Sequence, residues 1–200
     1  MIIQTPDVPR EINGDLWSSL ISPRPLFLIS TYDETGTINI APFSSVSLLS
    51  TYPPIIGFSI SKRKRIEKRT ELNVRRSLDL VINLVPRFLA DQMVQAAQQS
   101  DLTDDFKRLG LSETPGHKPQ NHLILECPAS IECVVDQIVG LAPSSATLFI
   151  VRPVTIRIRD EFCTTDGSFD TMSADLLASV GTETYISLNG DIITLPKTWD

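Results

Sequence analysis

The segment from Thr37 to Arg76 limits most strongly what this chain can fold into, because several structural signals follow one another within it. Strand-forming residues lead into a turn of small residues at 39–45, and the pair Pro53–Pro54 separates this turn from a second apolar strand. A basic loop and a helix come next. This dense series of short extended pieces favours an antiparallel sheet over the regular alternation of strands and helices in a parallel sheet.

The turn at 39–45, with the sequence NIAPFSS, consists largely of small side chains, a proline and two hydroxyls. Small side chains let a flat ligand approach the main chain, whose amides and carbonyls can pair with the edge of a heterocycle. The same pattern is also typical of a tight strand crossing in a barrel that binds nothing. The turn is therefore a candidate ligand site, with the strand crossing as the alternative.

A cationic run follows the apolar strand at 55–60, on a chain whose formal net charge is -6. Thr70 and Asn73 follow at helical spacing, so a hydroxyl, an amide and the first helix amides could surround a phosphate together with the cations. Ordinary surface pairing along the helix, as between Glu71 and Arg75, is the alternative. The run supplies eight of the eighteen basic residues: Lys62, Arg63, Lys64, Arg65, Lys68, Arg69, Arg75 and Arg76.

The composition narrows the class of protein. A chain of 200 residues with 42% hydrophobic and 21% charged residues suits one globular domain. Its negative net charge argues against nucleic acid as the main partner. No apolar stretch approaches the roughly 18 residues that a membrane-spanning helix needs, and the N-terminal residues lack the pattern of a secretory signal. We therefore expect a cytoplasmic protein without membrane contact.

The three cysteines are odd in number and form no CxxC pair, which favours reduced, buried thiols. His117 and His122 are the only histidines. Glu126 and Cys127 lie near His122 in the sequence, but together these residues match no familiar spacing of metal ligands. We predict no metal site.

Local patterns predict a mainly β fold with inserted helices, in the form of a closed or half-closed barrel. We expect strands over 26–31, 37–42, 46–49, 55–60, 80–85, 131–138, 146–151 and 154–159, and helices over 66–76, 88–97 and 102–109. A polar loop is expected over 111–121, a short helix or irregular segment over 172–180, and a hairpin around Asn189–Gly190. The whole chain, 1–200, reads as a single domain, with an N-terminal arm at 1–22, irregular except for a helical turn at 16–21, and a helical insertion at about 86–121.

The order of these pieces resembles the flavin reductase-like family, the FMN-binding split barrels of Greek-key type, from about residue 23 to residue 185. The resemblance rests on SPRP at 22–25, NIAPFS at 39–44, PPIIGFSI at 53–60, KRTELN at 68–73 and the strand at 79–84. Two places depart from the family pattern. Relatives often have Lys-Asp-Thr where this chain has Lys68-Arg69-Thr70, and ASVGTETY at 178–185 matches Leu-Gly-Gly-x-x-Tyr only loosely.

The resemblance implies where a flavin would bind. The turn at 41–45 would line the isoalloxazine ring, residues 58–60 would follow the ring and the ribityl chain, and the start of the helix would hold the phosphate together with Ser61 and Lys62 or Arg63. No catalytic side chain is implied, because the flavin carries the chemistry. The candidate cofactor-binding residues are Asn39, Ala41, Pro42, Phe43, Ser44, Ser45, Phe58, Ser59, Ile60, Ser61, Lys62, Arg63, Arg69, Thr70 and Asn73.

The resemblance also implies an FMN-binding oxidoreductase that uses NADH or NADPH and passes hydride to the flavin N5, in a homodimer. The chain has no GxGxxG motif, so it would bind the nicotinamide without a Rossmann domain. Two alternatives stay open. One is an FMN-binding electron carrier or flavin store without its own NAD(P)H site, and the other is a barrel that contacts nucleic acid through 62–65.

Overall fold

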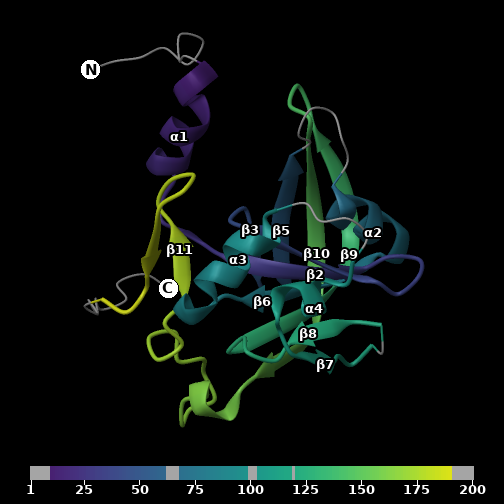
Figure 1. Ribbon diagram of the computed structural model, residues 1–200, viewed down its shortest axis with the longest axis vertical. Helices are drawn as coiled ribbons and strands as arrows, with labels where there is room; N and C mark the ends of the chain where they lie inside the picture. The colour runs from purple at the N-terminus through teal and green to yellow at the C-terminus, as the bar shows by residue number, and fades with distance from the viewer. Residues whose placement is uncertain (1–9, 62–67, 99–102, 119, 191–200) are drawn as a thin grey trace.

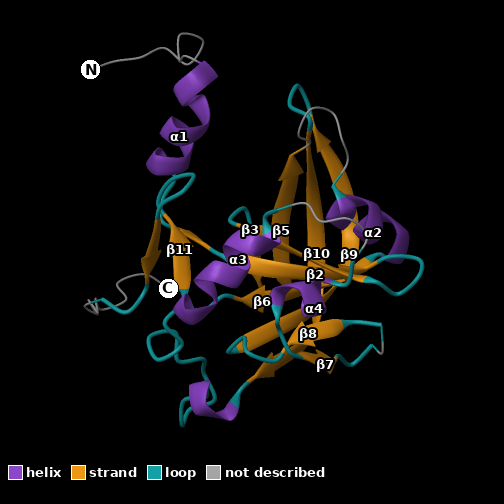
Figure 2. Cartoon of the chain, in the orientation of Figure 1, coloured by secondary structure: helices purple, strands orange, loops and turns teal. Residues whose placement is uncertain are grey.

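The computed structural model describes residues 10–61, 68–98, 103–118 and 120–190 (Figure 1). A seven-stranded antiparallel sheet in the order β3-β2-β6-β9-β10-β5-β4 forms the body of the molecule. Figure 2 shows the N-terminal helix apart from this sheet and the other labelled helices against it. The strands of the large sheet are β2 (Phe27–Tyr32), β3 (Ile38–Phe43), β4 (Ser47–Thr51), β5 (Pro54–Ser61), β6 (Asp79–Leu84), β9 (Ala129–Leu141) and β10 (Ala146–Ile158).

The two edge strands of this sheet, β3 and β4, are consecutive in the chain. β3 pairs only with β2, and β4 pairs only with β5. The connection over 44–46 is so short that Phe43 and Ser47 lie within about 14 Å of each other. The sheet must therefore curl until its two edges nearly meet, which makes it a split barrel. The connection at the split is shorter than the predicted turn at 39–45, because residues up to Phe43 belong to β3.

Apolar residues fill two cores, one inside the barrel and one between the barrel wall and the helical insertion. β2 contributes to both, because successive side chains of a strand point to opposite faces. Ile29 lies in the barrel interior with Phe58 and Phe149, whereas Leu28 packs in the outer core with Met93 and Phe106. A strand buried on both faces is predominantly apolar, as β2 and β6 are.

Helices and small sheets surround the barrel. The three-stranded sheet β1-β11-β12 and the two-stranded sheet β7-β8 lie outside the large sheet. No helix among the described residues is long and apolar enough to span a bilayer. These elements are α1 (Arg10–Leu20), β1 (Arg24–Pro25), α2 (Arg69–Ser77), η2 (Arg87–Leu89), α3 (Ala90–Ala96), α4 (Asp105–Leu109), β7 (Glu113–Pro115), β8 (His122–Ile124), η3 (Asp160–Phe162), β11 (Leu177–Ser179) and β12 (Tyr185–Ser187).

Most predicted strands and helices are present, with ends shifted by a few residues, but several predictions are wrong. The arm is helical from Arg10 and not irregular, and the predicted loop over 111–121 contains β7, which pairs with β8. Residues 146–158 form one strand, β10, and not two. The ladder tolerates Pro153 because the register with β9 shifts there and the pairing of β10 with β5 has already ended at Val151.

The C-terminal part also differs from the prediction. Leu177–Ser179 forms the strand β11 inside the segment predicted to be helical or irregular. The strand before Asn189–Gly190 is present as β12, and it pairs with β11. The expected second half of that hairpin, over 191–194, lies outside the described residues.

Candidate functional site

The candidate ring site lies at the split of the barrel, where β3 ends and the connection to β4 begins. Ala41, Pro42 and Ser44 are half-buried, and Ser45 is exposed. Since β3 is an edge strand, the main-chain groups on its outer side have no neighbouring strand in the sheet. Main-chain donors and acceptors of the turn are therefore open to a ligand on that side.

The hydroxyls of the two turn serines have different surroundings. Ser45 Oγ donates to Ser59 O at 2.9 Å and accepts from Ser59 N at 3.2 Å. It thus takes the place of a strand partner for β5 just beyond the last β4–β5 pair, Ser47 with Gly57. Within the described residues Ser44 makes no side-chain hydrogen bond, so its hydroxyl is the one available to a ligand.

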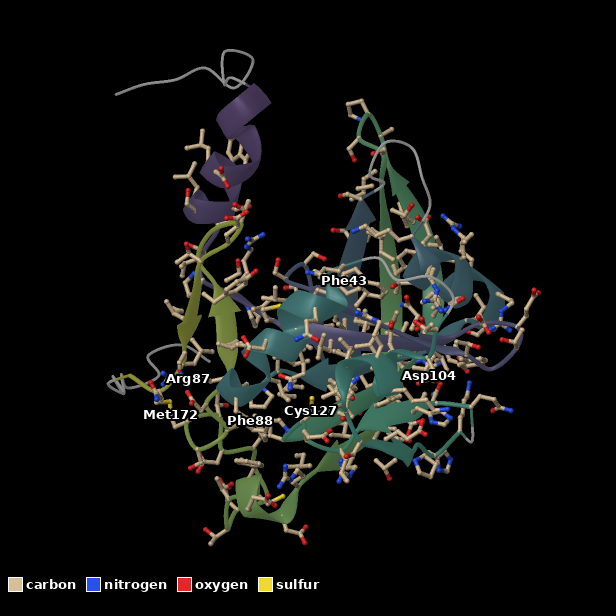
Figure 3. All side chains as sticks on the ribbon, in the orientation of Figure 1. Phe43, Arg87, Phe88, Asp104, Cys127 and Met172 are labelled. Carbon is tan, nitrogen blue, oxygen red and sulfur yellow. The ribbon has the colours of Figure 1, made fainter. Side chains whose placement is uncertain are left out.

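The apolar members of the predicted set point into the barrel core. Phe58 and Ile60 are fully buried, and Phe43 is nearly so (Figure 3). The ring of Phe58 stacks on Phe149 at 5.2 Å between centroids and meets the edge of Phe43 at 5.7 Å. The side chains of Phe43, Phe58 and Ile60 form the wall behind the site, so these residues can offer a ligand only their main-chain atoms. By strand alternation, Ser59 and Ser61 point to the other face of β5.

A cluster of buried polar side chains joins β2 and β3 to the start of α2. Asn39 Nδ2 donates to Thr70 Oγ1 at 3.0 Å and to Thr31 Oγ1 at 3.5 Å. Asn73 Nδ2 donates to the same Thr31 oxygen at 3.1 Å. All four residues are at most 7% exposed. The structure therefore brings Asn39, Thr70 and Asn73 together, and it adds Thr31, which the sequence did not single out.

The hydrogen bonds of this cluster orient the Thr70 hydroxyl. Its oxygen accepts from Asn39, so its own proton is free to be donated in another direction. The hydroxyl proton of Thr31 is also free to be donated, because the Thr31 oxygen accepts from both amides. Two buried hydroxyls can thus act as donors at the start of α2. Asn39 and Asn73 act here by holding the threonines.

Arg69 supplies the charge beside this cluster. Its Nη2 atom is buried and has no hydrogen-bond partner among the described residues. Burying a guanidinium nitrogen without an acceptor costs free energy, so an anion at this position would be stabilised. Arg69 is also the first residue of α2, and the N-cap residue Lys68 makes no side-chain cap bond. The first amides of the helix therefore remain available to an anion.

Other basic residues of the run have structural partners. Arg75 donates to Glu71 Oε1 from Nε and Nη2 at 3.1 and 2.9 Å, so the predicted pairing is present, but it is not a surface pair because the Glu71 side chain is buried. Glu71 is fully buried and also accepts from Thr147 on β10, so this pair fastens α2 to the barrel. Arg76 donates to Tyr32 O and covers the Tyr32 ring. The predicted residues Lys62 and Arg63 lie outside the described residues.

The cysteines and histidines form no second site. Cys127 and Cys133 are buried and free, whereas Cys163 is exposed, contrary to the expectation that all three would be buried. His122 Nδ1 lies 2.6 Å from Glu113 Oε2, while the His117 amide donates to Glu132. The described residues contain no group of three or more His, Cys, Asp or Glu side chains that could hold a metal ion.

The donor set fits a ligand with a flat ring and an anionic tail. The ring end offers open main-chain groups and the Ser44 hydroxyl at the split. The other end offers Arg69, two buried hydroxyls and the first amides of α2, which suit a phosphate. Asn39 on β3 connects the two ends, since it lies two residues before Ala41 and bonds to Thr70. FMN has this combination of a flat heterocycle and a phosphate.

Comparisons with known proteins give the family and the fold of the chain. Residues 19–172 match the model of the flavin reductase like domain family. The fold matches nitrilotriacetate monooxygenase component B from Bacillus cereus with a TM-score of 0.90, at 18% identity over 98% of both chains. It matches a proposed flavin reductase with a split barrel domain from Shewanella frigidimarina with a TM-score of 0.88, at 22% identity over 98% of this chain and 99% of that chain.

A third similar structure is flavoredoxin of Desulfovibrio vulgaris, with a TM-score of 0.77 and 23% identity over 88% of this chain and 92% of that chain. At these identities the three structures show the shared fold, a split barrel. The family match covers most of the chain, including the turn at 41–45 and the whole of α2. The chain belongs to the flavin reductase-like family.

Proposed function

We propose that the protein is an FMN-binding oxidoreductase that takes electrons from NADH or NADPH. The observation that carries the proposal is the buried, unpartnered Nη2 of Arg69 beside Thr70 and Asn73 at the start of α2. A buried guanidinium nitrogen without an acceptor among the described residues fits the phosphate of FMN. Family membership supports a flavin as the ligand class.

The residues of the chain would divide the flavin between them. Arg69, the first amides of α2 and the hydroxyls of Thr70 and Thr31 would hold the phosphate. Asn39 and Asn73 would keep these hydroxyls in place. Main-chain groups of the turn at 41–45 and the Ser44 hydroxyl would bind the polar edge of the ring. Phe43, Phe58 and Ile60 would support the site from the core side, with their main chain along the ligand and Ser59 and Ser61 on the open face.

Bound flavin supplies the ability to accept a hydride and to pass electrons on one or two at a time. The protein's part is to place the ring and to limit the access of water to it. This division of work needs no side-chain base.

A matched pair of ligands tests the phosphate site. We expect Arg69→Glu with Thr70→Ala to weaken FMN binding by at least about tenfold, because charged hydrogen bonds contribute about 1.5–3 kcal/mol each. Binding of riboflavin, which lacks the phosphate, should change far less. Flavin fluorescence quenching measures both affinities.

The control is Arg87→Glu, the same change of charge at an exposed position that Figure 3 places away from α2. It should leave both affinities unchanged. Equal losses of FMN and riboflavin in the double variant would contradict the phosphate site, and an unmodified protein that binds no flavin would contradict the proposed function as a whole.

The second candidate is an FMN-binding electron carrier or flavin store, which the fold likeness to flavoredoxin favours. Anaerobic stopped-flow mixing of the FMN-loaded protein with NADH or NADPH separates the two. Fast bleaching of the flavin absorbance supports the oxidoreductase. If millimolar nicotinamide causes no bleaching while dithionite does, the carrier is the right assignment.

A further inference from the structure

A carboxylate from the helical insertion closes the edge of β3 beside the ring site. Asp105, the first residue of α4, is 2% exposed, and its Oδ2 accepts from the main-chain N–H of Ile40 at 2.8 Å. Arg108 Nε donates to Asp105 Oδ1 at 2.7 Å, and Arg108 Nη1 donates to Gln95 O. The contact therefore joins α3 and α4 to the strand that leads into the turn at 41–45.

The contact between Asp105 and Ile40 determines which main-chain donors β3 can offer to a ligand. The Ile40 N–H points away from β2, as its bond to Asp105 shows, and outward-pointing groups recur every second residue in an antiparallel edge strand. The next outward position is Pro42, which has no N–H. One donor is thus occupied and the next does not exist. The first free outward donor toward the split is in the turn itself, at Ser44.

The main-chain N–H of Ile40 needs an acceptor, but this acceptor does not have to carry a charge. A neutral amide or hydroxyl oxygen would serve Ile40 equally well. A buried ion pair has to overcome a desolvation penalty that often cancels its attraction. Asp105 and Arg108 are both largely shielded, with side-chain exposures of 3% and 22%. The negative charge is therefore held in a poorly hydrated place, hydrogen-bonded to Ile40, the residue directly before the turn assigned to the flavin ring.

We propose that Asp105 is a positioning residue for the flavin site. It closes the edge of β3 so that only the turn offers donors to the ring, and its charge lowers the reduction potential of the bound flavin, because reduction adds electron density near an existing negative charge. Arg108 opposes this second effect. The inference rests on the proposed flavin function and adds how the insertion controls the site.

Two substitutions with opposite expected signs test the charge effect in the full-length, FMN-loaded protein. Asp105→Asn keeps an oxygen for Ile40 and removes the charge, so the midpoint potential of bound FMN should rise. Arg108→Gln removes the Arg108 cation and keeps the bond between Asp105 and Ile40, so the midpoint potential of bound FMN should fall. A residue that only stabilises the fold would not shift the potential in opposite directions in these two variants.

Asp104→Asn is the matched control. Asp104, labelled in Figure 3, directly precedes Asp105 in the chain. It caps α4 by accepting from the amides of Phe106 and Lys107, a task that asparagine also performs. The midpoint potential of FMN bound to Asp104→Asn should equal that in the unmodified protein. Asp105→Leu removes the acceptor as well, and it should weaken the binding of FMN and of riboflavin alike, by at least about tenfold.

The outcomes are distinct. If the unmodified protein binds FMN but Asp105→Asn and Arg108→Gln leave the midpoint potential unchanged, the charge effect is wrong. If Asp105→Leu leaves both flavin affinities unchanged, the positioning role is wrong. If the unmodified protein binds no FMN, the proposed function fails first and the inference fails with it.

Discussion

At the scale of single residues, Thr31 illustrates how a side chain that no local pattern singles out can govern a site. Its hydroxyl oxygen accepts from both Asn39 and Asn73, and these amides hold the start of α2 against β2 and β3. Thr31→Val keeps the shape and removes the acceptor. We expect the free energy of unfolding to fall by about 1–3 kcal/mol, because two buried amides lose a partner. We also expect the affinity for FMN to fall more than the affinity for riboflavin.

Urea unfolding and flavin titration measure these two effects. Thr37→Val is the matched control, because Thr37 is half-buried and, among the described residues, its hydroxyl hydrogen-bonds only with Thr35 in the β2–β3 turn. It should change neither quantity much. A loss of FMN and riboflavin binding to the same degree in Thr31→Val would show that Thr31 supports the barrel and not the phosphate end.

The buried thiols give a residue-scale prediction about pH. Burial, with a smaller contribution from Glu132, raises the pKa of Cys133 to about 12, and burial with Glu126 raises the pKa of Cys127 well above its usual range. A raised pKa in the folded state means that the folded protein keeps a proton that the unfolded chain releases. The stability from these thiols is therefore complete below about pH 8.5, the pKa of a free thiol, and is lost as the pH rises toward 12.

The measurement is the free energy of unfolding between pH 8 and pH 11. Cys127→Ala with Cys133→Ala should flatten the decrease over this range, whereas Cys163→Ala, at the exposed cysteine, should not. In the native protein we also expect one thiol, Cys163, to react rapidly with a disulfide reagent. Fast reaction of all three thiols would contradict the burial of the other two.

Local sequence patterns indicated much of the candidate site. The residues that they did not indicate are those whose roles depend on contacts between distant parts of the chain. The turn at 41–45 and the start of α2 have local signals: small residues, proline, and cations with hydroxyls at helical spacing. Thr31 and Asp105 have none, since a threonine in a strand and an aspartate at a helix start are ordinary there. Their contacts reach Asn73 and Ile40, which are 42 and 65 residues away in the chain. Only the folded arrangement reveals such partners.

At the scale of elements, the same limit explains the loop at 111–121. Its prolines and glycine predicted a loop, but its structure depends on β9. The carboxylate of Glu132, 1% exposed, accepts from the amides of His117 and Lys118 at 2.6 and 3.2 Å and from Asn121 Nδ2 at 3.0 Å. One buried side chain thus organises the whole segment.

Gly116 makes this packing testable. A Cβ atom built on Gly116 would lie 2.6 Å from Glu132 Oε2, and the carboxylate cannot retreat without breaking its hydrogen bonds. We expect Gly116→Ala to lower the unfolding free energy by about 1–3 kcal/mol, as overpacking does. Gly140→Ala, where nothing lies within 4 Å of the new atom, is the control and should be nearly neutral. Urea unfolding that shows equal stabilities for the two variants would contradict this packing.

At the scale of the whole molecule, α1 is the element that the chain alone leaves unexplained. Figure 1 shows it projecting from the barrel. The side chains from Gly14 to Leu20 are exposed or half-buried, with Trp17 at 42% and Leu20 at 62% exposure. An isolated helix of this length, 11 residues, is marginal in water. We infer that its apolar residues pack on a second copy of the chain, in the homodimer that the family resemblance implies.

The inference predicts a specific loss of assembly. We expect the unmodified protein to be a dimer by light scattering at micromolar concentration, and Leu20→Ser to shift it toward monomer, because burial of a leucine contributes about 1.5–3 kcal/mol at each of two symmetry-related contacts. Leu125→Ser, the same substitution at a 42% exposed position between β8 and β9, is the control and should stay dimeric. A monomer without any substitution, or a Leu20→Ser variant that dimerises as well as Leu125→Ser, would mean that α1 does not mediate contact between copies.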